Sequence, residues 1–240
     1  MKIAILGTGA GCAADAVVLS PLGEIWAEER TKQEIRSVAL LSDIPEEIRT
    51  VAERIAAEMR SAEDEAKAAQ DADLVILPRV DVAESEAESF SHKVVALAER
   101  NRKAWFVVRS KVPVGFTRHL REQGVRIICL PDLAFGDVRA ALRPTHIVAG
   151  INRKDPQAAD AAGRIAEALR IFKKDAPVQV MGEDGAETVM QFTDEYLCMQ
   201  KKFWAELSEF AAANGADERV MQEGVRGVIE ELLPDQKGRK

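Results

Sequence analysis

Three glycines follow directly after the first apolar run of the chain, residues 2–6, at positions Gly7, Gly9 and Gly11. An apolar run, a tight glycine turn and a helical pattern predict a strand, a turn and a helix. Glycines allow the backbone to approach a pyrophosphate, and the first turn of a helix offers N–H groups without partners. The turn therefore predicts a dinucleotide site, with a tight turn that binds no ligand as the alternative. A dinucleotide fingerprint would have its third glycine where this chain has Cys12, whose thiol is expected to crowd the helix against the strand unless Gly11 or Ala13 relieves the approach.

Two carboxylates stand at the end of the second expected strand, residues 24–27. Glu28 or Glu29 could accept hydrogen bonds from an adenosine ribose, which favours NAD as the cofactor. Arg30 lies beside them, and a guanidinium can instead bind the 2′-phosphate of NADP. We expect NAD, with NADP as the open alternative.

These residues need a framework, and the chain supplies one by alternating short apolar runs with helical patterns. Further strands are expected at residues 73–77, 104–108, 125–130, 146–150 and 178–181. Helices are expected between them, and residues 61–70 are interpreted as a charged helical connector. Strands that alternate with helices predict an α/β fold in which helices cover both faces of a parallel sheet.

A long amphipathic helix is expected at residues 186–213. Apolar residues recur there at steps of three and four, which places them on one helix face: Val189, Phe192, Tyr196, Met199, Phe203, Leu207 and Phe210. This stripe is longer than a small domain needs, so it predicts a homodimer through residues 186–213. A core helix with a solvated face is the alternative. Residues 217–232 predict a final helix, and we expect two domains, 1–182 and 183–240.

Four stretches together resemble the UDP-glucose/GDP-mannose dehydrogenase family, whose members use NAD to oxidise nucleotide sugars. They are MKIAILGTG at the start, SKVPVGFTR at 110–118, LPDLAFGDVRAALRPTHIVAG at 130–150, and the long helix through GAD at 215–217. They occur in the family's order and extend over the whole chain. The resemblance implies a Rossmann-like doubly wound sheet that binds NAD, followed by a small all-helical domain whose long helix forms the dimer interface. We also expect Leu77, Pro78 and Ser110 to contact the cofactor.

The family's catalytic groups are altered in this sequence. Where the family has a Ser-Thr pair before VPVG, a Pro-Glu pair, and a Lys and an Asn four apart on the long helix, this chain has Ser110-Lys111, Pro131-Asp132, Met190 and Asp194. The chain ends before any segment that could supply the family's nucleophilic cysteine or its nucleotide-sugar-binding domain. Oxidation to the acid proceeds through a thioester, which requires a thiolate. We therefore expect at most a two-electron oxidation of a small or nucleotide-linked alcohol.

The catalytic candidates are Lys111, Asp132 and Asp194. Lys111 could take the hydroxyl proton in place of the lysine missing from the helix, because an alcohol dehydrogenase needs a base near the carbinol oxygen. Asp132 and Asp194 could polarise a water or pair with Lys111. The alternatives are an exposed loop lysine and two capping or surface carboxylates, in a catalytically silent relative that binds a dinucleotide or a partner. A second chain that completes a two-chain enzyme is a further alternative.

The composition excludes several further classes of function. The 240 residues carry a net charge of −7, which argues against general affinity for nucleic acid. No apolar run approaches 18 residues and no signal peptide is recognisable at the start, so neither a membrane span nor secretion is expected. Three cysteines without a CxxC pair and three scattered histidines predict neither a disulfide framework nor a metal site. A cytoplasmic location fits these features.

Overall fold

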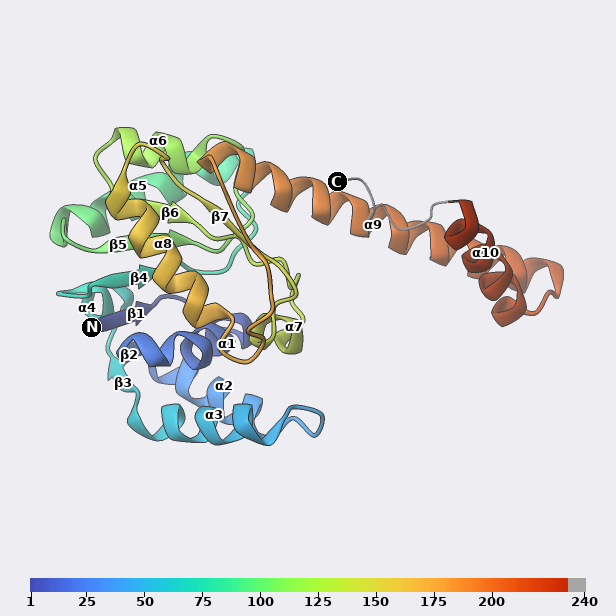
Figure 1. Cartoon of the computed structure of the whole chain (residues 1–240), viewed down its shortest axis with the longest axis horizontal. Helices are drawn as coiled ribbons and strands as arrows, with labels where there is room; N and C mark the ends of the chain where they lie inside the picture. The colour runs from blue at the N-terminus through green and yellow to red at the C-terminus, as the bar shows by residue number, and fades with distance from the viewer. Residues whose placement is uncertain (233–240) are drawn as a thin grey trace. The chain divides into compact units, whose positions relative to one another are not determined.

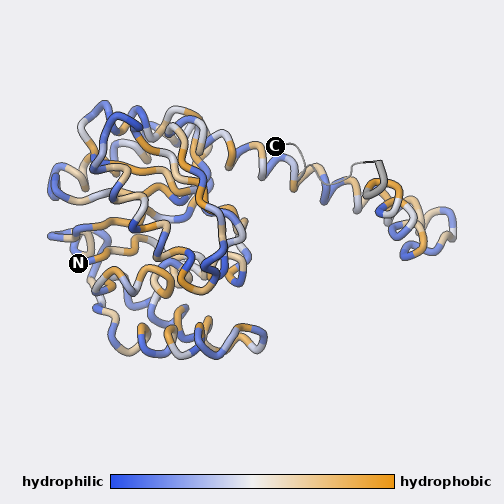
Figure 2. The backbone as a smooth tube through the Cα atoms, in the orientation of Figure 1, coloured by the Kyte–Doolittle hydropathy of each residue, from blue (hydrophilic) through white to orange (hydrophobic). Residues whose placement is uncertain are grey.

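The computed structural model describes residues 1–232 of the chain, with side chains up to residue 229. An eight-stranded sheet lies at the centre of the N-terminal part, in the order β3-β2-β1-β4-β5-β6-β7-β8 within the described residues (Figure 1). The strands are β1 (Lys2–Ile5), β2 (Glu24–Glu28), β3 (Arg60–Ala62), β4 (Leu74–Ile76), β5 (Trp105–Val108), β6 (Ile127–Cys129), β7 (Ile147–Gly150) and β8 (Val178–Met181). Figure 2 shows that the strands are largely apolar, as a sheet buried on both faces requires.

Helices cover both faces of this sheet. They are α1 (Ala10–Leu19), α2 (Glu29–Ala39), α3 (Glu46–Glu58), α4 (Glu65–Ala69), α5 (Ala87–Arg100), α6 (Phe116–Glu122), α7 (Val138–Leu142) and α8 (Pro156–Leu169), with 3-10 turns η1 (Ser20–Leu22) and η2 (Glu84–Glu86). Along β1, Ile3 and Ile5 join a core with α1, α2, α3, α7 and α8, whereas Ala4 and Leu6 join a second core with α4, α5 and α6. The doubly wound α/β fold predicted from the sequence is therefore confirmed.

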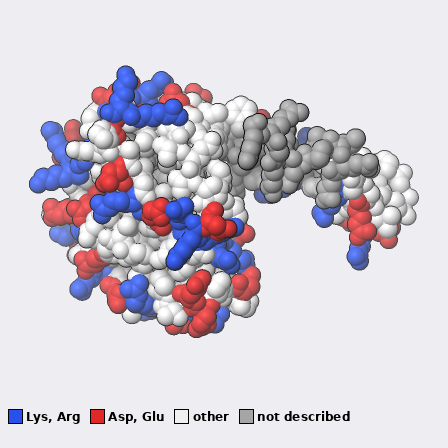
Figure 3. Space-filling view, in the orientation of Figure 1, with Lys and Arg blue, Asp and Glu red and all other residues white. Residues whose placement is uncertain are grey.

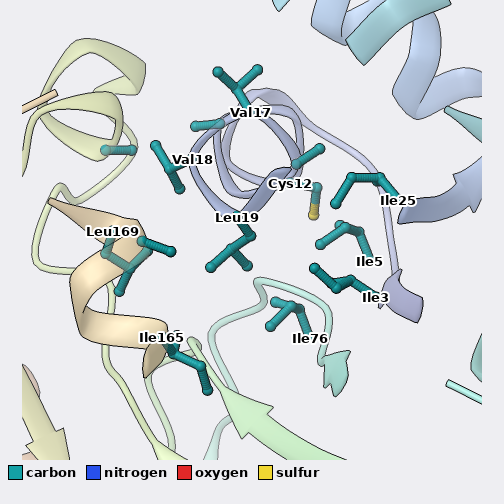
Figure 4. Packing of buried hydrophobic residues seen from close by; sticks show 14 of the residues in the cluster. Ile3, Ile5, Cys12, Val17, Val18, Leu19, Ile25, Ile76, Ile165 and Leu169 are labelled. Atoms are coloured by element: carbon teal, nitrogen blue, oxygen red, sulfur yellow. The ribbon is translucent and has the colours of Figure 1, made fainter. Parts of the chain in front are cut away.

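Helix α1 is the most deeply buried of these helices, because it packs among α2, α7 and α8 as well as against β1. Figure 4 shows Leu19 of α1 among Ile76 of β4 and Ile165 of α8. A helix fixed on so many sides holds its first turn, which follows the glycines, in a defined position at the carboxyl edge of the sheet.

The last two strands are the part of the sheet that departs from the predicted parallel arrangement. Strands β1 to β6 are parallel, but β7 pairs with β6 in the antiparallel sense, with Cys129 opposite Gly150, and β8 follows β7 in parallel. The connection from β6 to β7 holds only the five-residue α7, a helix about 7.5 Å long. Such a short helix is not a crossover that returns the chain to the other edge, so β7 runs backwards.

The expected helical connector at residues 61–70 is also wrong in part. Residues 60–62 form the short edge strand β3, which pairs with β2, and only Glu65–Ala69 are helical. The sequence Arg60-Ser61-Ala62 carries no apolar alternation because an edge strand of three residues buries little.

The long helix is confirmed as α9 (Glu183–Asn214), followed by α10 (Glu218–Leu232). The chain divides into two compact units, Met1–Gln191 (unit 1) and Phe192–Lys240 (unit 2), so that the border falls within α9. The domain border expected at 182/183 coincides with the start of this helix and stays a prediction.

Unit 2 is a pair of helices within its described residues. The Ser208 hydroxyl on α9 donates to Glu218 on α10 over 2.6 Å, and the Arg226 guanidinium lies 5.1 Å from the centre of the Trp204 ring. Five side chains of the predicted stripe are nevertheless between 45% and 66% exposed: Phe192, Tyr196, Met199, Phe203 and Phe210. An apolar surface of this kind is available for a partner.

Basic and acidic side chains are interspersed on the face of unit 1 seen in Figure 3. Among the helices in the described part of the chain, none is long and apolar enough to cross a membrane. Within the same residues, no group of three or more His, Cys, Asp or Glu side chains is arranged to hold a metal ion.

Candidate functional site

The predicted site residues of unit 1 gather at the carboxyl edge of the parallel strands. Strand β1 lies between β2 and β4, so the strand order reverses beside it. In open α/β sheets, ligands bind outside the carboxyl ends of the strands at such a switch point. Strand β2 ends here at Glu28. The loops that follow β1, β4, β5 and β6 start at the same edge, and they carry Gly7, Pro78, Ser110 and Asp132 respectively.

The glycine turn has the backbone that its residue types predict. Gly7 and Gly9 have φ angles of +79° and +110°, which side chains other than glycine rarely adopt. A Cβ atom on Gly7 would lie 3.0 Å from the Pro78 Cβ atom, whereas one on Gly9 would meet nothing within 4 Å. Gly9 precedes α1 and has no side chain that could cap the helix. The N–H groups of the first turn therefore lack helical partners and can bind an anion.

Cys12 does not disturb this turn. Its thiol is buried under the helix, where Sγ lies 3.6 Å from the Leu6 carbonyl oxygen, and burial raises the pKa of the thiol to about 11. The close approach occurs instead at Gly11, where a Cβ atom would lie 2.6 Å from the Arg79 Cδ atom. A side chain at position 11 would therefore require the Arg79 side chain to shift.

The carboxylate that reaches the turn is Glu34, which the sequence analysis missed. The Gly9 N–H donates to Glu34 Oε2 over 2.6 Å, and Arg30 Nε lies 3.6 Å from Glu34 Oε1. Glu28 is half-buried at the end of β2, and Glu29 accepts a hydrogen bond from the Ser61 hydroxyl. Buried Thr31, three residues before Glu34 on the same face of α2, donates to the Gly7 carbonyl oxygen, so this face of the helix lies against the turn.

Four charged side chains form an ionic cluster beside the turn: Asp15, Arg79, Arg109 and Asp132. Arg79 binds Asp15 through two hydrogen bonds, of 2.6 and 2.8 Å, and also contacts Asp132. Arg109 Nη2 lies 3.2 Å from Asp15 Oδ1, and Arg109 Nη1 donates to the Leu130 carbonyl oxygen over 2.8 Å. Burial alone would raise the pKa of Asp15, but Arg109 and Arg79 hold it below its ordinary value. Two positive and two negative charges thus balance within the cluster.

Asp132, predicted as a catalytic residue, has both of its oxygens engaged in this cluster. Oδ2 contacts Arg79, and Oδ1 lies 3.7 Å from Arg109 and accepts from the Ala134 N–H. The structure therefore pairs Asp132 with arginines that the sequence analysis missed. Its catalytic assignment stays a prediction.

The predicted cofactor contacts Leu77, Pro78 and Ser110 build the floor of the edge. Leu77 is buried and its N–H donates to the Val107 carbonyl oxygen. The Ser110 hydroxyl donates to the Pro78 carbonyl oxygen and accepts from the Val80 N–H, which ties the loop after β4 to the loop after β5. Their contact with a cofactor stays a prediction.

Lys111 is half-buried in the same loop, and its carbonyl oxygen accepts from the Val82 N–H. The start of α9 fixes the loop from its other end. Glu187, which is 1% exposed, accepts from the N–H groups of Gly115 and Thr117 over 2.6 and 2.7 Å, and burial raises the pKa of its carboxyl group. Gln191 donates to the Val112 carbonyl oxygen over 2.9 Å. These contacts hold Lys111 at the edge that also carries the glycine turn.

The remaining catalytic candidate, Asp194, belongs to unit 2. It is half-buried on α9, with the Cys198 sulfur 4.0 Å from Oδ1. Its role stays a prediction. Met190, one turn earlier and in unit 1, is buried.

The sheet order, the glycine turn and the two-sided helix cover define the class of the fold: a Rossmann-like α/β sheet with a helical C-terminal region. No protein-family model matches the chain. The chain is 24% identical over 237 residues to the UDP-glucose 6-dehydrogenase of Streptococcus pneumoniae, a match that covers 92% of this chain and 59% of that relative.

Two solved structures have the same fold. A GDP-mannose dehydrogenase from Pseudomonas aeruginosa, solved as a ternary complex, matches with a TM-score of 0.72 and 18% identity over 100% of this chain and 59% of its own. The V8 variant of an imine reductase from Myxococcus stipitatus, in complex with NAD+, matches with a TM-score of 0.64 and 11% identity over 98% of this chain and 74% of its own. The resemblance to nucleotide-sugar dehydrogenases is thus confirmed, and this chain spans about 59% of the length of the curated relative.

Proposed function

We propose that unit 1 binds a nicotinamide dinucleotide, NAD, at the carboxyl edge of its sheet and catalyses a two-electron oxidation of a small or nucleotide-linked alcohol. The observation that carries the proposal is the glycine turn at the switch point, which opens the buried helix α1. The resemblance to dehydrogenases, and a structural neighbour solved with NAD+, support the same cofactor class.

The residues present fit such a cofactor. Gly9 leaves open space beside the first turn of α1, and α1 itself has no acidic residue in that turn, although the Glu34 carboxylate of α2 reaches the Gly9 N–H. Its N–H groups would hold the pyrophosphate together with Arg79, whose guanidinium lies against Gly11. Bound NAD would accept the hydride from the alcohol carbon.

The protein's own part in the reaction is to orient the alcohol and remove its hydroxyl proton. Lys111 is our candidate for that proton acceptor, because the loop that carries it is fixed at the cofactor edge by Glu187 and Gln191. Cys12 and Cys129 of unit 1 are both buried, and burial raises the pKa of each thiol. Neither is suited to form the thiolate that a four-electron oxidation through a thioester requires.

The test is a titration of NADH fluorescence with the full chain. We expect saturable binding that Gly9→Asp abolishes, since an added carboxylate would meet the phosphates. Gly124→Asp is the matched control, because Gly124 has a comparable φ of +87° and open space but follows α6, away from the turn. Binding that survives Gly9→Asp, or that Gly124→Asp weakens equally, would contradict the proposed site. Reduction of bound NAD by members of a panel of alcohols then tests the reaction itself.

A further inference from the structure

Three carboxylates follow strand β2, and they differ in what they contact. Glu28 ends the strand, and Glu29 is bound by the Ser61 hydroxyl from β3. Glu34 alone among these three contacts the glycine turn, through the 2.6 Å hydrogen bond from the Gly9 N–H. Glu34 lies about one and a half helical turns beyond the strand end, yet its carboxylate reaches the turn that follows β1.

In dinucleotide-binding α/β folds, an acidic residue about 20 residues beyond the glycine turn binds the adenosine ribose. Glu34 lies 25 residues beyond Gly9 and contacts it directly. A carboxylate only accepts hydrogen bonds, so it can bind the two hydroxyl donors of the ribose in NAD. The 2′-phosphate of NADP has no matching donor and carries about −1.5 to −2 charges at neutral pH, as phosphate monoesters do. A carboxylate here therefore attracts one cofactor and repels the other.

Arg30 is the group that could reverse this preference. Its side chain is 74% exposed, and its guanidinium lies 3.6 Å from Glu34. A guanidinium is well suited to a phosphate, so Arg30 released from Glu34 would favour NADP. Arg30, which would attract a 2′-phosphate, and Glu34, which would repel it, therefore lie next to each other.

We propose that Glu34 is the residue that selects NAD over NADP, by binding the adenosine ribose and by keeping Arg30 paired. The inference rests on the proposed function and assigns its cofactor specificity to Glu34 rather than to the carboxylates at the strand end. Glu34→Gln is the suitable variant because its amide oxygen can still accept from the Gly9 N–H, while the negative charge is lost.

The experiment measures dissociation constants of NADH and NADPH for the full chain and its variants. We expect the wild type to bind NADH more tightly than NADPH. Glu34→Gln should reduce this preference on the order of tenfold, chiefly because NADPH binds more tightly to the variant. Adding Arg30→Gln to Glu34→Gln should remove the gain for NADPH and leave NADH nearly as before. Glu53→Gln makes the same chemical change on an exposed position of α3 and serves as the matched control.

The outcomes distinguish a failure of the role of Glu34 from a failure of the proposed function. If Glu34 merely occupies the turn, Glu34→Gln will lower the dissociation constants of NADH and NADPH by the same factor. That result would overturn the role of Glu34 but not the proposed cofactor site. A preference that collapses in Glu28→Gln but not in Glu34→Gln overturns it as well. If neither nucleotide binds the folded wild type, the proposed function fails and the role of Glu34 fails with it.

Discussion

Replacing Asp15 by asparagine should destabilise unit 1 strongly, because it removes one of the two negative charges from the ionic cluster. Asp15 is 0% exposed, and both Arg79 and Arg109 bind it. Asparagine keeps the shape of the side chain but leaves two buried guanidinium groups with Asp132 as their remaining carboxylate. Breaking a buried ion pair in this way costs about 3–5 kcal/mol. For a domain of this size, that loss lowers the midpoint of thermal unfolding by roughly 10 °C.

Tryptophan fluorescence in a Trp204→Phe background measures the effect in unit 1, where Trp26 and Trp105 then remain as reporters. Asp43→Asn is the control: Asp43 pairs with Arg139 on the surface, where both side chains are about half exposed, so the midpoint should hardly change. A shift in Asp15→Asn as small as that in Asp43→Asn would refute the view that the cluster is an integrated buried network.

The same residue predicts a pH dependence. The pKa of Asp15 in the folded chain lies below its ordinary value, so the unfolded state binds the proton more readily. Its contribution to stability is therefore present above the ordinary carboxylate pKa and is lost as the pH falls through the folded-state pKa. The difference between wild type and Asp15→Asn should shrink as the pH is lowered through that range. A difference that stays constant at acid pH would show that another mechanism causes the destabilisation.

Two further predictions concern the dimer and the base. Phe203→Glu should convert the predicted homodimer into a monomer at micromolar concentration, as measured by light scattering, because it places a charge in the exposed apolar stripe of α9. Ala205→Glu, on the opposite side of the helix, is the control. A dimer that persists in Phe203→Glu would contradict the predicted interface. Lys111→Met should lower the rate of alcohol oxidation about 100-fold or more if the amine takes the hydroxyl proton. Exposed Lys174→Met is its control, and an equally active Lys111→Met variant would exclude that role.

The sequence predicted the fold well where local patterns determine structure. The apolar runs and the glycines identified β1, its turn and α1, because strand period and turn chemistry are local properties. The reversal of β7 was missed, since strand direction depends on whether the connection crosses the sheet, and no residue of β7 itself encodes that. β3 was missed because its three residues have no apolar pattern to detect.

The site was less predictable because its contacts join distant parts of the chain. Asp15, Arg79, Arg109 and Asp132 come from α1 and from the loops after β4, β5 and β6, so no spacing in the sequence brings them together. Asp132 was identified by its motif, but a motif does not reveal the two arginines that hold its oxygens.

The ionic cluster holds together the loops that form the carboxyl edge of the sheet. Arg79 fills the space beside Gly11, and Arg109 and Asp132 occupy the ends of the next two strands. Four charges that neutralise one another connect these loops through side-chain contacts within the protein. A preorganised edge lowers the cost of ordering loops on binding. Asp15→Asn should then weaken NADH binding in addition to stability, and unchanged affinity in the folded variant would limit the cluster to a purely structural role.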